Sequence, residues 1–206
     1  QAVVFCAPRT ARAGLFLTLS HALTSIAVSC KRAQALDVHF FVGCIAETPA
    51  KLELSYRQST QARAYAFPEQ AAPVTTYEDV LAGKLLPCPE PPEELLRDIP
   101  AAVQCGSRAA FVQNCEALFA WFVEREIRDA TFIRMCVLRL CYSILKKPAS
   151  DMPMSYYEFT NFQQEIMAAA SMEELRACFE NFVSLYWLRR QGEKPPRRIL
   201  TERVSE

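Results

Sequence analysis

Nine cysteines and two histidines are the side chains of this sequence that could bind a metal, form disulfides or act as nucleophiles. The cysteines stand singly in apolar segments, never as Cys-x-x-Cys, at positions 6, 30, 44, 88, 105, 115, 136, 141 and 178. Disulfide frameworks are typical of small secreted chains, and a structural zinc site needs ligands at short local spacing. The pattern therefore favours reduced, buried thiols that behave as small hydrophobic side chains.

For one thiol, that of Cys88, the sequence leaves a functional role open beside the structural one. Cys88 lies between Pro87 and Pro89 in a segment with loop composition, where an exposed sulfur could act as a redox sensor. Such a role requires a lowered thiol pKa next to a basic group. The two histidines, His21 and His39, have no Cys or His partner at zinc-ligand spacing, so we interpret both as ordinary core or surface residues.

Catalytic motifs are missing from the sequence. It contains no Gly-x-Ser-x-Gly, no P-loop and no Gly-rich dinucleotide fingerprint, and five glycines leave little material for a phosphate cradle. We therefore expect no catalytic residue, no cofactor and no metal site.

Basic residues gather near the end of the chain, at Arg189, Arg190, Lys194, Arg197, Arg198 and Arg203. They could contact a DNA backbone, and Arg197, Arg198 and Arg203 are the candidates that we single out. The alternative is a solvated linker whose charges keep it open. The whole chain balances 23 basic against 23 acidic residues, so net charge does not favour a nucleic-acid partner.

The region from Asp37 to Val80 is predicted to form a strand, a helix and a second strand. Residues 38–45 are rich in β-branched and aromatic types on both alternating faces, which suits a strand covered on both sides. Thr48-Pro49 supplies a cap and a first-turn proline for a helix whose apolar face would contain Leu52, Tyr56, Thr60, Ala64 and Phe67. Val74-Thr75-Thr76-Tyr77 is the predicted return strand. Arg57 and Arg63 are expected to pair with Glu78 and Asp79 at the surface.

Other elements flank this region. Residues 1–7 are predicted to form a strand, and residues 12–34 a helix with Leu15, Leu19, Leu23, Ile26 and Cys30 on its buried face. From Glu93 onward only helix signals occur, including Ser107, Asp129 and Ser171 as caps and Gly106 and Gly192 as stops. Aromatic residues at helical spacing are expected to form the core of this helical part.

These patterns together predict an α+β chain with four segments. Residues 1–86 form a partial α/β module, residues 87–92 a Pro-rich linker, residues 93–191 an all-α helical bundle, and residues 192–206 a second linker. No apolar run reaches the ~18 residues needed to cross a bilayer, so we expect no membrane contact.

The run VHFFVGCIAETPAKLELSYRQSTQARAYAF, followed by VTTYEDV, resembles the last third of a GGDEF domain, which is ferredoxin-like. It is more similar to the degenerate GGDEF-like module in the middle of AraC-type transcription regulators, many of which are response regulators. There a helical segment and a helix-turn-helix domain follow, and Pro195-Pro196-Arg197-Arg198 resembles the lead-in to that domain.

The resemblance implies a non-enzymatic, cytoplasmic, bacterial signal-relay region. Its partners would be its own upstream and downstream domains, with DNA bound only through the helix-turn-helix domain, and homodimer contacts remain open. We expect the chain to be a piece of a longer protein. Two other functions also stay open: a ligand-sensing helical module, and a fragment of an active diguanylate cyclase.

Overall fold

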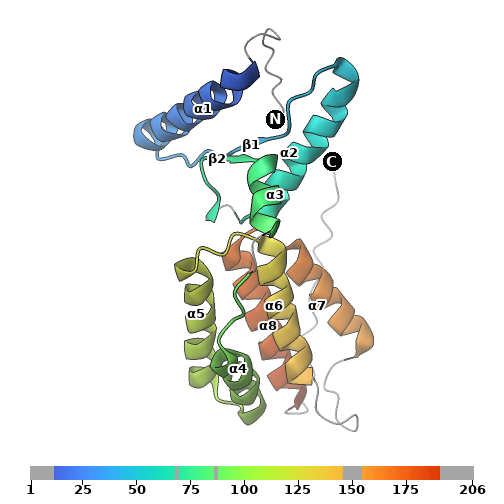
Figure 1. Cartoon of the computed structure of the whole chain (residues 1–206). Coiled ribbons are helices and arrows are strands. Elements are labelled where there is room, and N and C mark those ends of the chain that lie inside the picture. The colour runs from blue at the N-terminus through green and yellow to red at the C-terminus, as the bar shows by residue number, and fades with distance from the viewer. Residues whose placement is uncertain (1–11, 68–69, 86–87, 146–154, 191–206) are drawn as a thin grey trace, which may run out of the picture. The chain divides into compact units, whose positions relative to one another are not determined.

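The computed structural model describes residues 12–67, 70–85, 88–145 and 155–190 (Figure 1). Over these ranges the chain is mostly helical, with one parallel sheet of two strands, which agrees with an α+β chain. It divides into two compact units, each described separately. The first contains the residues up to Glu90 together with Trp121–Ile133, and the second contains Pro91–Ala120 and the residues from Arg134 onward.

The first unit is built on a strand–helix–strand motif. Its elements are α1 (Arg12–Gln34), β1 (Phe40–Val42), η2 (Pro49–Lys51), α2 (Leu52–Tyr65), β2 (Val74–Thr76) and α3 (Tyr77–Leu85). The two strands are parallel, with Phe40 opposite Val74 and Val42 opposite Thr76, and α2 forms the crossover between them. Helices α1 and α2 lie on opposite sides of this sheet (Figure 1). The predicted order of elements in this region is confirmed.

Strand β1 is shorter and less covered than its composition predicts. The apolar run extends over residues 38–45, but only Phe40–Val42 pair, because β2 offers only three residues to pair with. All three residues of β1 are half-buried. The expectation of a strand covered fully on both faces is therefore wrong for the part of the sheet that the structure describes.

Helix α2 approaches the sheet through small side chains. A Cβ atom added to Gly43, directly after β1, would lie 1.9 Å from the backbone oxygen of Ser55 in α2. Ala62 is fully buried, whereas Tyr56 is 59% exposed and Leu52 is 39% exposed. The predicted inner face of this helix is therefore wrong for Leu52, Tyr56, Thr60 and Ala64, because close backbone approach selects residues without bulk there, whereas Phe67, just after the helix, is buried as predicted.

Local hydrogen bonds set the boundary between β2 and α3. The Asp79 carboxylate accepts bonds from the Thr76 backbone N–H (2.8 Å) and hydroxyl (2.7 Å), and the Asp79 N–H donates to the Thr76 hydroxyl at 3.1 Å. This reciprocal cap starts a helix at Tyr77, which the sequence had placed in the strand. Arg57 forms an ion pair with Glu53, one turn away in α2, at 2.7 Å. The Asp79 carboxylate bonds to Thr76. Neither residue therefore makes the predicted ion pair between α2 and the segment after β2.

The second unit consists largely of the helices that the sequence predicts after Glu93. They are α4 (Glu93–Cys105), α5 (Arg108–Glu124), α6 (Ala130–Leu145), α7 (Tyr156–Ala168) and α8 (Met172–Arg190). The end of α5, the following loop and the start of α6 belong to the first unit. The expected stop at Gly192 and the strand over residues 1–7 lie outside the described residues.

The predicted helix ends in this region are confirmed where the structure shows their hydrogen bonds. Gly106 ends α4 in the left-handed region, with φ at 75°, and the N–H of Ser107 returns to the Ala102 carbonyl at 2.9 Å. Asp129 caps α6 by accepting bonds from the Thr131 and Phe132 amides. Ser171 accepts a bond from the Glu174 N–H at 3.0 Å at the start of α8.

Aromatic rings fill the interior of the helical bundle, as predicted. Phe179, Phe182 and Phe111 are buried, and edge-on contacts join Phe111 to Phe179 at 5.6 Å and Phe162 to Phe182 at 5.7 Å between ring centroids. Edge-to-face arrangements match the positive edge of one ring to the negative face of another, so they add to the burial of apolar surface. Trp121 and Phe132, also expected in the core, are only half-buried.

Candidate functional site

The last turn of α8 carries the most concentrated set of long-range polar contacts in the described chain. The indole Nε1 of Trp187 donates to the Val103 carbonyl at 2.7 Å, and this bond is buried and joins residues 84 positions apart. The rings of Trp187 and Phe111 make an edge-on contact with 5.7 Å between their centroids, and the guanidinium of Arg108 lies 5.5 Å from the centroid of the Trp187 ring. This tryptophan thus fixes α8 to α4 and α5.

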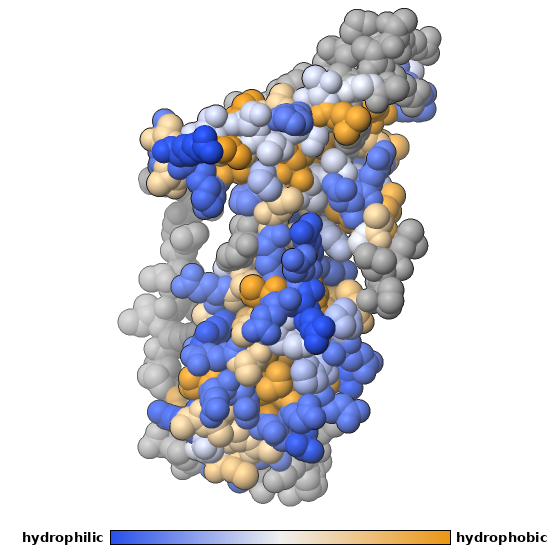
Figure 2. Space-filling model, turned by 60° about the vertical axis from the view of Figure 1, so that its left-hand side comes forward, coloured by the Kyte–Doolittle hydropathy of each residue, from blue (hydrophilic) through white to orange (hydrophobic). Residues whose placement is uncertain are grey.

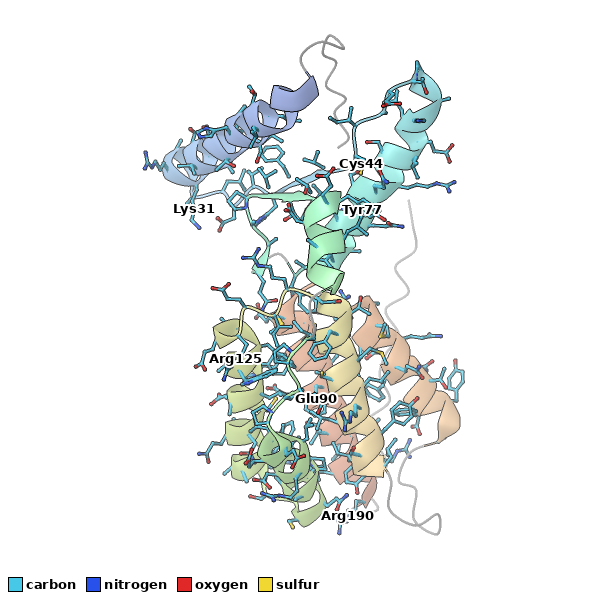
Figure 3. All side chains as sticks on the ribbon, viewed as in Figure 1. Lys31, Cys44, Tyr77, Glu90, Arg125 and Arg190 are labelled. Carbon is cyan, nitrogen blue, oxygen red and sulfur yellow. The ribbon has the colours of Figure 1, made fainter. Side chains whose placement is uncertain are left out.

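Arg190 makes a second bond to the same end of α4. Its Nη1 donates to the Gln104 carbonyl, and Figure 3 shows Arg190 at the end of α8 beside α4. The last carbonyls of a helix find no N–H donor within that helix and carry the negative end of its dipole. A cation at this position therefore compensates the C-terminal end of α4 while it fixes the end of α8.

Arg189 connects the same turn to the start of α7. Its Nη2 donates to the Glu158 carboxylate, and both side chains are mostly buried, with 32% and 28% of their surface exposed. The other carboxylate oxygen of Glu158 accepts bonds from the backbone N–H and the hydroxyl of Ser155, each at 2.9 Å. These bonds lower the pKa of Glu158 and keep it ionised, and the bond from the Ser155 backbone N–H has the largest effect.

Together these three residues anchor the end of α8 to α4, α5 and α7. We call Trp187, Arg189 and Arg190 the exit turn, because the chain passes from here to Pro195-Pro196 in the sequence. The exit turn has no nucleophile, and its charges are engaged in bonds within the bundle. It is suited to holding the chain in one geometry rather than to catalysis.

The residues predicted to contact DNA are only partly described. Arg197, Arg198 and Arg203 lie outside the described residues, so their role stays a prediction. Arg189 and Arg190, which belong to the same basic cluster in the sequence, donate to Glu158 and to Gln104. These two arginines are therefore part of the bundle and not of an open, solvated linker.

The thiols are less uniformly buried than predicted. Cys115, Cys136 and Cys141 are buried, Cys30, Cys44 and Cys178 are half-buried, and Cys88 and Cys105 are exposed. Burial raises the pKa of Cys115 to about 12 and that of Cys141 well above its ordinary value. At Cys88, partial desolvation and then the Asp129 carboxylate also raise the thiol pKa. A redox sensor needs the opposite shift, so the environment of Cys88 argues against that alternative.

The histidines do not meet at a metal site. His21 is exposed on α1, whereas His39 is half-buried with its Nδ1 at 3.3 Å from the Ala72 carbonyl oxygen. Among the described residues, no group of three His, Cys, Asp or Glu side chains could hold a metal ion.

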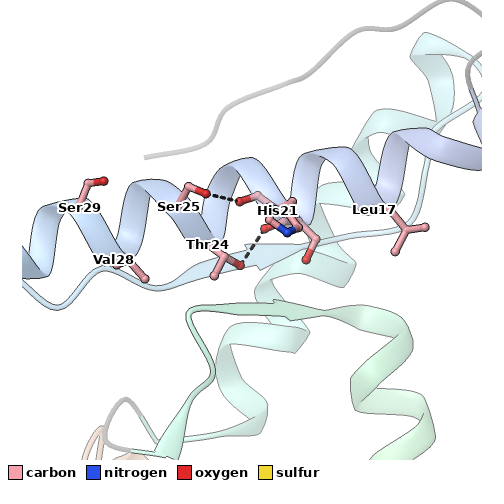
Figure 4. A pocket seen from close by; sticks show the side chains of 7 residues that line it. Leu17, His21, Thr24, Ser25, Val28 and Ser29 are labelled. Carbon is pink, nitrogen blue, oxygen red and sulfur yellow. Dashed lines mark hydrogen bonds between the residues drawn. The ribbon is translucent and has the colours of Figure 1, made fainter.

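A hollow runs along α1 in the first unit (Figure 4). One helix supplies its whole lining, namely Leu17, Ser20, His21, Thr24, Ser25, Val28 and Ser29. The hydroxyls of Thr24 and Ser25 donate to carbonyls one turn back, at 2.8 and 2.9 Å. Hydroxyls satisfied in this way offer few directed bonds to a ligand, so we do not interpret the hollow as a binding site.

The surface of the first unit exposes several large apolar side chains. Leu17 is 76% exposed, Leu54 55% and Ile26 49%, and Figure 2 shows hydrophobic residues next to hydrophilic ones over this unit. Ile26 was predicted to be buried but is exposed; among the α1 side chains that the structure describes, Leu23, as predicted, and the smaller Ala27 are buried. Over the described residues, no helix combines the length and the apolar character needed to cross a bilayer.

Comparison of the chain with family models, with curated proteins and with solved structures found no match.

Sequence reasoning missed the contacts of the exit turn. The pattern Ser155-x-x-Glu158, which supplies the acceptor for Arg189, is the signature of a capping box and could have been found from spacing alone. The bonds of Trp187 to Val103 and of Arg189 to Glu158 join distant segments, and the sequence carries no local signal for them. The same holds for Arg134, which donates two bonds to the Ala169 carbonyl, at 2.7 and 3.2 Å.

Proposed function

We propose that this chain is the signal-relaying middle region of a bacterial, cytoplasmic transcription regulator of AraC type. In this role the α/β unit is a degenerate GGDEF-like piece, and the helices transmit an upstream input to a downstream DNA-binding domain. The resemblance of residues 38–80 to the GGDEF-like module supports this assignment. The parallel strand–helix–strand motif and the helices after Glu93 agree with the order of elements in that family.

The observation that carries the proposal is the anchoring of the exit turn. A relay must transmit a change of its own geometry to whatever follows it, and this requires a fixed point where the chain leaves the bundle. Bonds from Trp187 and Arg190 to α4, and from Arg189 to α7, provide such a point. The six basic residues from Arg189 to Arg203 would then adjoin the DNA-binding domain.

The first test is the gene itself. The reading frame should continue beyond Glu206 into two helix-turn-helix units, and upstream of Gln1 into an input domain. A stop codon directly after Glu206 would overturn the proposal.

The second test uses the full-length protein in a transcription reporter. Arg190→Gln should change the response to the input, because it removes the bond to the Gln104 carbonyl and so loosens the exit turn. Arg97→Gln is the matched control, since Arg97 pairs only with its neighbour Asp98 on the exposed side of α4. Equal responses from the two variants would contradict a relay through the exit turn.

A separate measurement tests the alternative that the chain is a fragment of an active diguanylate cyclase. Cyclic dinucleotide synthesis needs metal-binding carboxylates and a phosphate-binding turn. Titration calorimetry with GTP and Mg²⁺ should therefore detect no binding in the micromolar range, and such binding would favour the cyclase fragment.

A further inference from the structure

We propose that the first turn of α7 and the exit turn of α8 form one conformational switch. Because both turns bond to Glu158, loss of order in either turn would weaken the other. The switch would be the regulatory device of the bundle. Its existence does not depend on the proposed function, which only adds that the exit turn leads to a DNA-binding domain.

The first step is the double use of one carboxylate. Oε2 of Glu158 accepts bonds from the N–H and the hydroxyl of Ser155, while Oε1 accepts the bond from Arg189. The Ser155 hydroxyl in turn accepts the Glu158 N–H at 3.2 Å, which completes the capping box. A carboxylate that folds back to close this box is thereby also aimed at Arg189.

The second step is the dependence of Arg189 on this carboxylate. Nε of Arg189 is buried and finds no acceptor among the described residues, so Glu158 is the group that compensates this half-buried guanidinium. Taking Glu158 away would leave a desolvated cation, which is strongly unfavourable. The exit turn would then rearrange until the guanidinium reached solvent.

The third step follows from thermodynamic reciprocity. If opening the first turn of α7 weakens the exit turn, opening the exit turn must weaken the first turn of α7 by the same free energy. Anything that unwinds the start of α7, such as a bound partner or a modification of Ser155, would therefore release Arg189. Trp187 and Arg190 in the same turn bond to α4 and not to α7, so the change should weaken the exit turn without opening the rest of α8.

Amide hydrogen exchange followed by mass spectrometry tests the coupling on the whole chain, without DNA. Ser155→Ala removes the two bonds that the Ser155 hydroxyl makes with Glu158, but it leaves the Glu158 carboxylate and the Arg189 guanidinium themselves in place. It should speed exchange in the first turn of α7 and also at residues 187–190, by roughly three- to tenfold, the effect of losing a hydrogen bond of ordinary strength. In an Arg189→Gln background, the effect of Ser155→Ala on residues 187–190 should disappear.

Ser171→Ala is the matched control, because it removes a Ser hydroxyl that likewise accepts the N–H of the Glu three residues later, but at the opposite end of α8. It should speed exchange near Met172 but leave residues 187–190 at the wild-type rate. Three results would overturn the switch: faster exchange in α7 alone, an equal effect of Ser171→Ala on residues 187–190, or a Ser155→Ala effect that persists without Arg189. A gene that ends at Glu206 would refute the relay function and leave this coupling intact.

Discussion

Gly43→Ala offers the sharpest test of how α2 lies on the sheet. A Cβ at this position would be 1.9 Å from the Ser55 carbonyl oxygen and 2.7 Å from its carbon, whereas real Cβ contacts essentially never fall below 3.0 Å. The obstacle is backbone within a helix, which cannot turn away as a flexible side chain can. Helix and strand must therefore separate by about 1 Å, and overpacking of this kind costs about 3 kcal/mol or more.

The loss of stability in the Gly43→Ala variant should appear in the first unit. We expect the urea midpoint for amide exchange over residues 38–67 to fall clearly in the Gly43→Ala variant. Gly14→Ala is the matched control, since nothing lies within 4 Å of a Cβ added there and the residue is exposed in α1. Alanine in a helix is favoured over glycine by about 0.5–1 kcal/mol, so this control should stabilise the protein. A Gly43→Ala variant as stable as the wild type would refute the close approach of α2.

The other predictions concern thiols, acid stability and a helix end. A thiol-alkylating reagent at pH 8 should modify the exposed Cys105 rapidly in the native protein and Cys115 only after denaturation, because burial raises the pKa of Cys115 to about 12; fast native labelling of Cys115 would contradict its burial. The pKa of Glu158 is lowered in the folded state, so its stabilising effect is present above its ordinary pKa of 4.5 and is lost as the pH falls through the folded value. The stability difference between the wild type and Glu158→Gln should therefore shrink in urea titrations below pH 4.5, and a constant difference would argue against the ion pair. Gly106→Ala should lower the melting temperature of the bundle by the equivalent of about 1 kcal/mol, because Gly106 has φ at 75°, and an unchanged melting temperature would contradict the left-handed cap.

Much of the fold could be predicted because its signals are local. Helix ends depend on a few neighbouring residues, so Asp129, Gly106 and Ser171 could be recognised as caps and stops from their position beside apolar periodic segments. The order of strand, helix and strand between residues 38 and 76 also follows from composition and periodicity. The bounds of α1, Arg12–Gln34, agree with its apolar repeat.

Which face of a helix is buried was not determined in this way. Leu52 and Tyr56 continue the apolar repeat of α2, yet the helix turns Ala62 and the Ser55 backbone to the sheet. The distance of approach decides this, because a helix lying against a glycine buries small residues and leaves larger ones at the rim. Periodicity in the sequence reports side-chain polarity and carries no information about that distance.

The exit turn shows the same limit more clearly. Each of its arginines is an ordinary basic residue in the sequence, and the cluster resembles a solvated linker. Folding brings α8 beside the end of α4 and the start of α7, and only then do Val103, Gln104 and Glu158 become acceptors for its donors. The amino-acid sequence by itself thus determined helix ends such as those at Gly106, Asp129 and Ser171, since their bonds form between near neighbours. Only the tertiary structure decides which charges are used within the protein, because their partners are far apart in the chain.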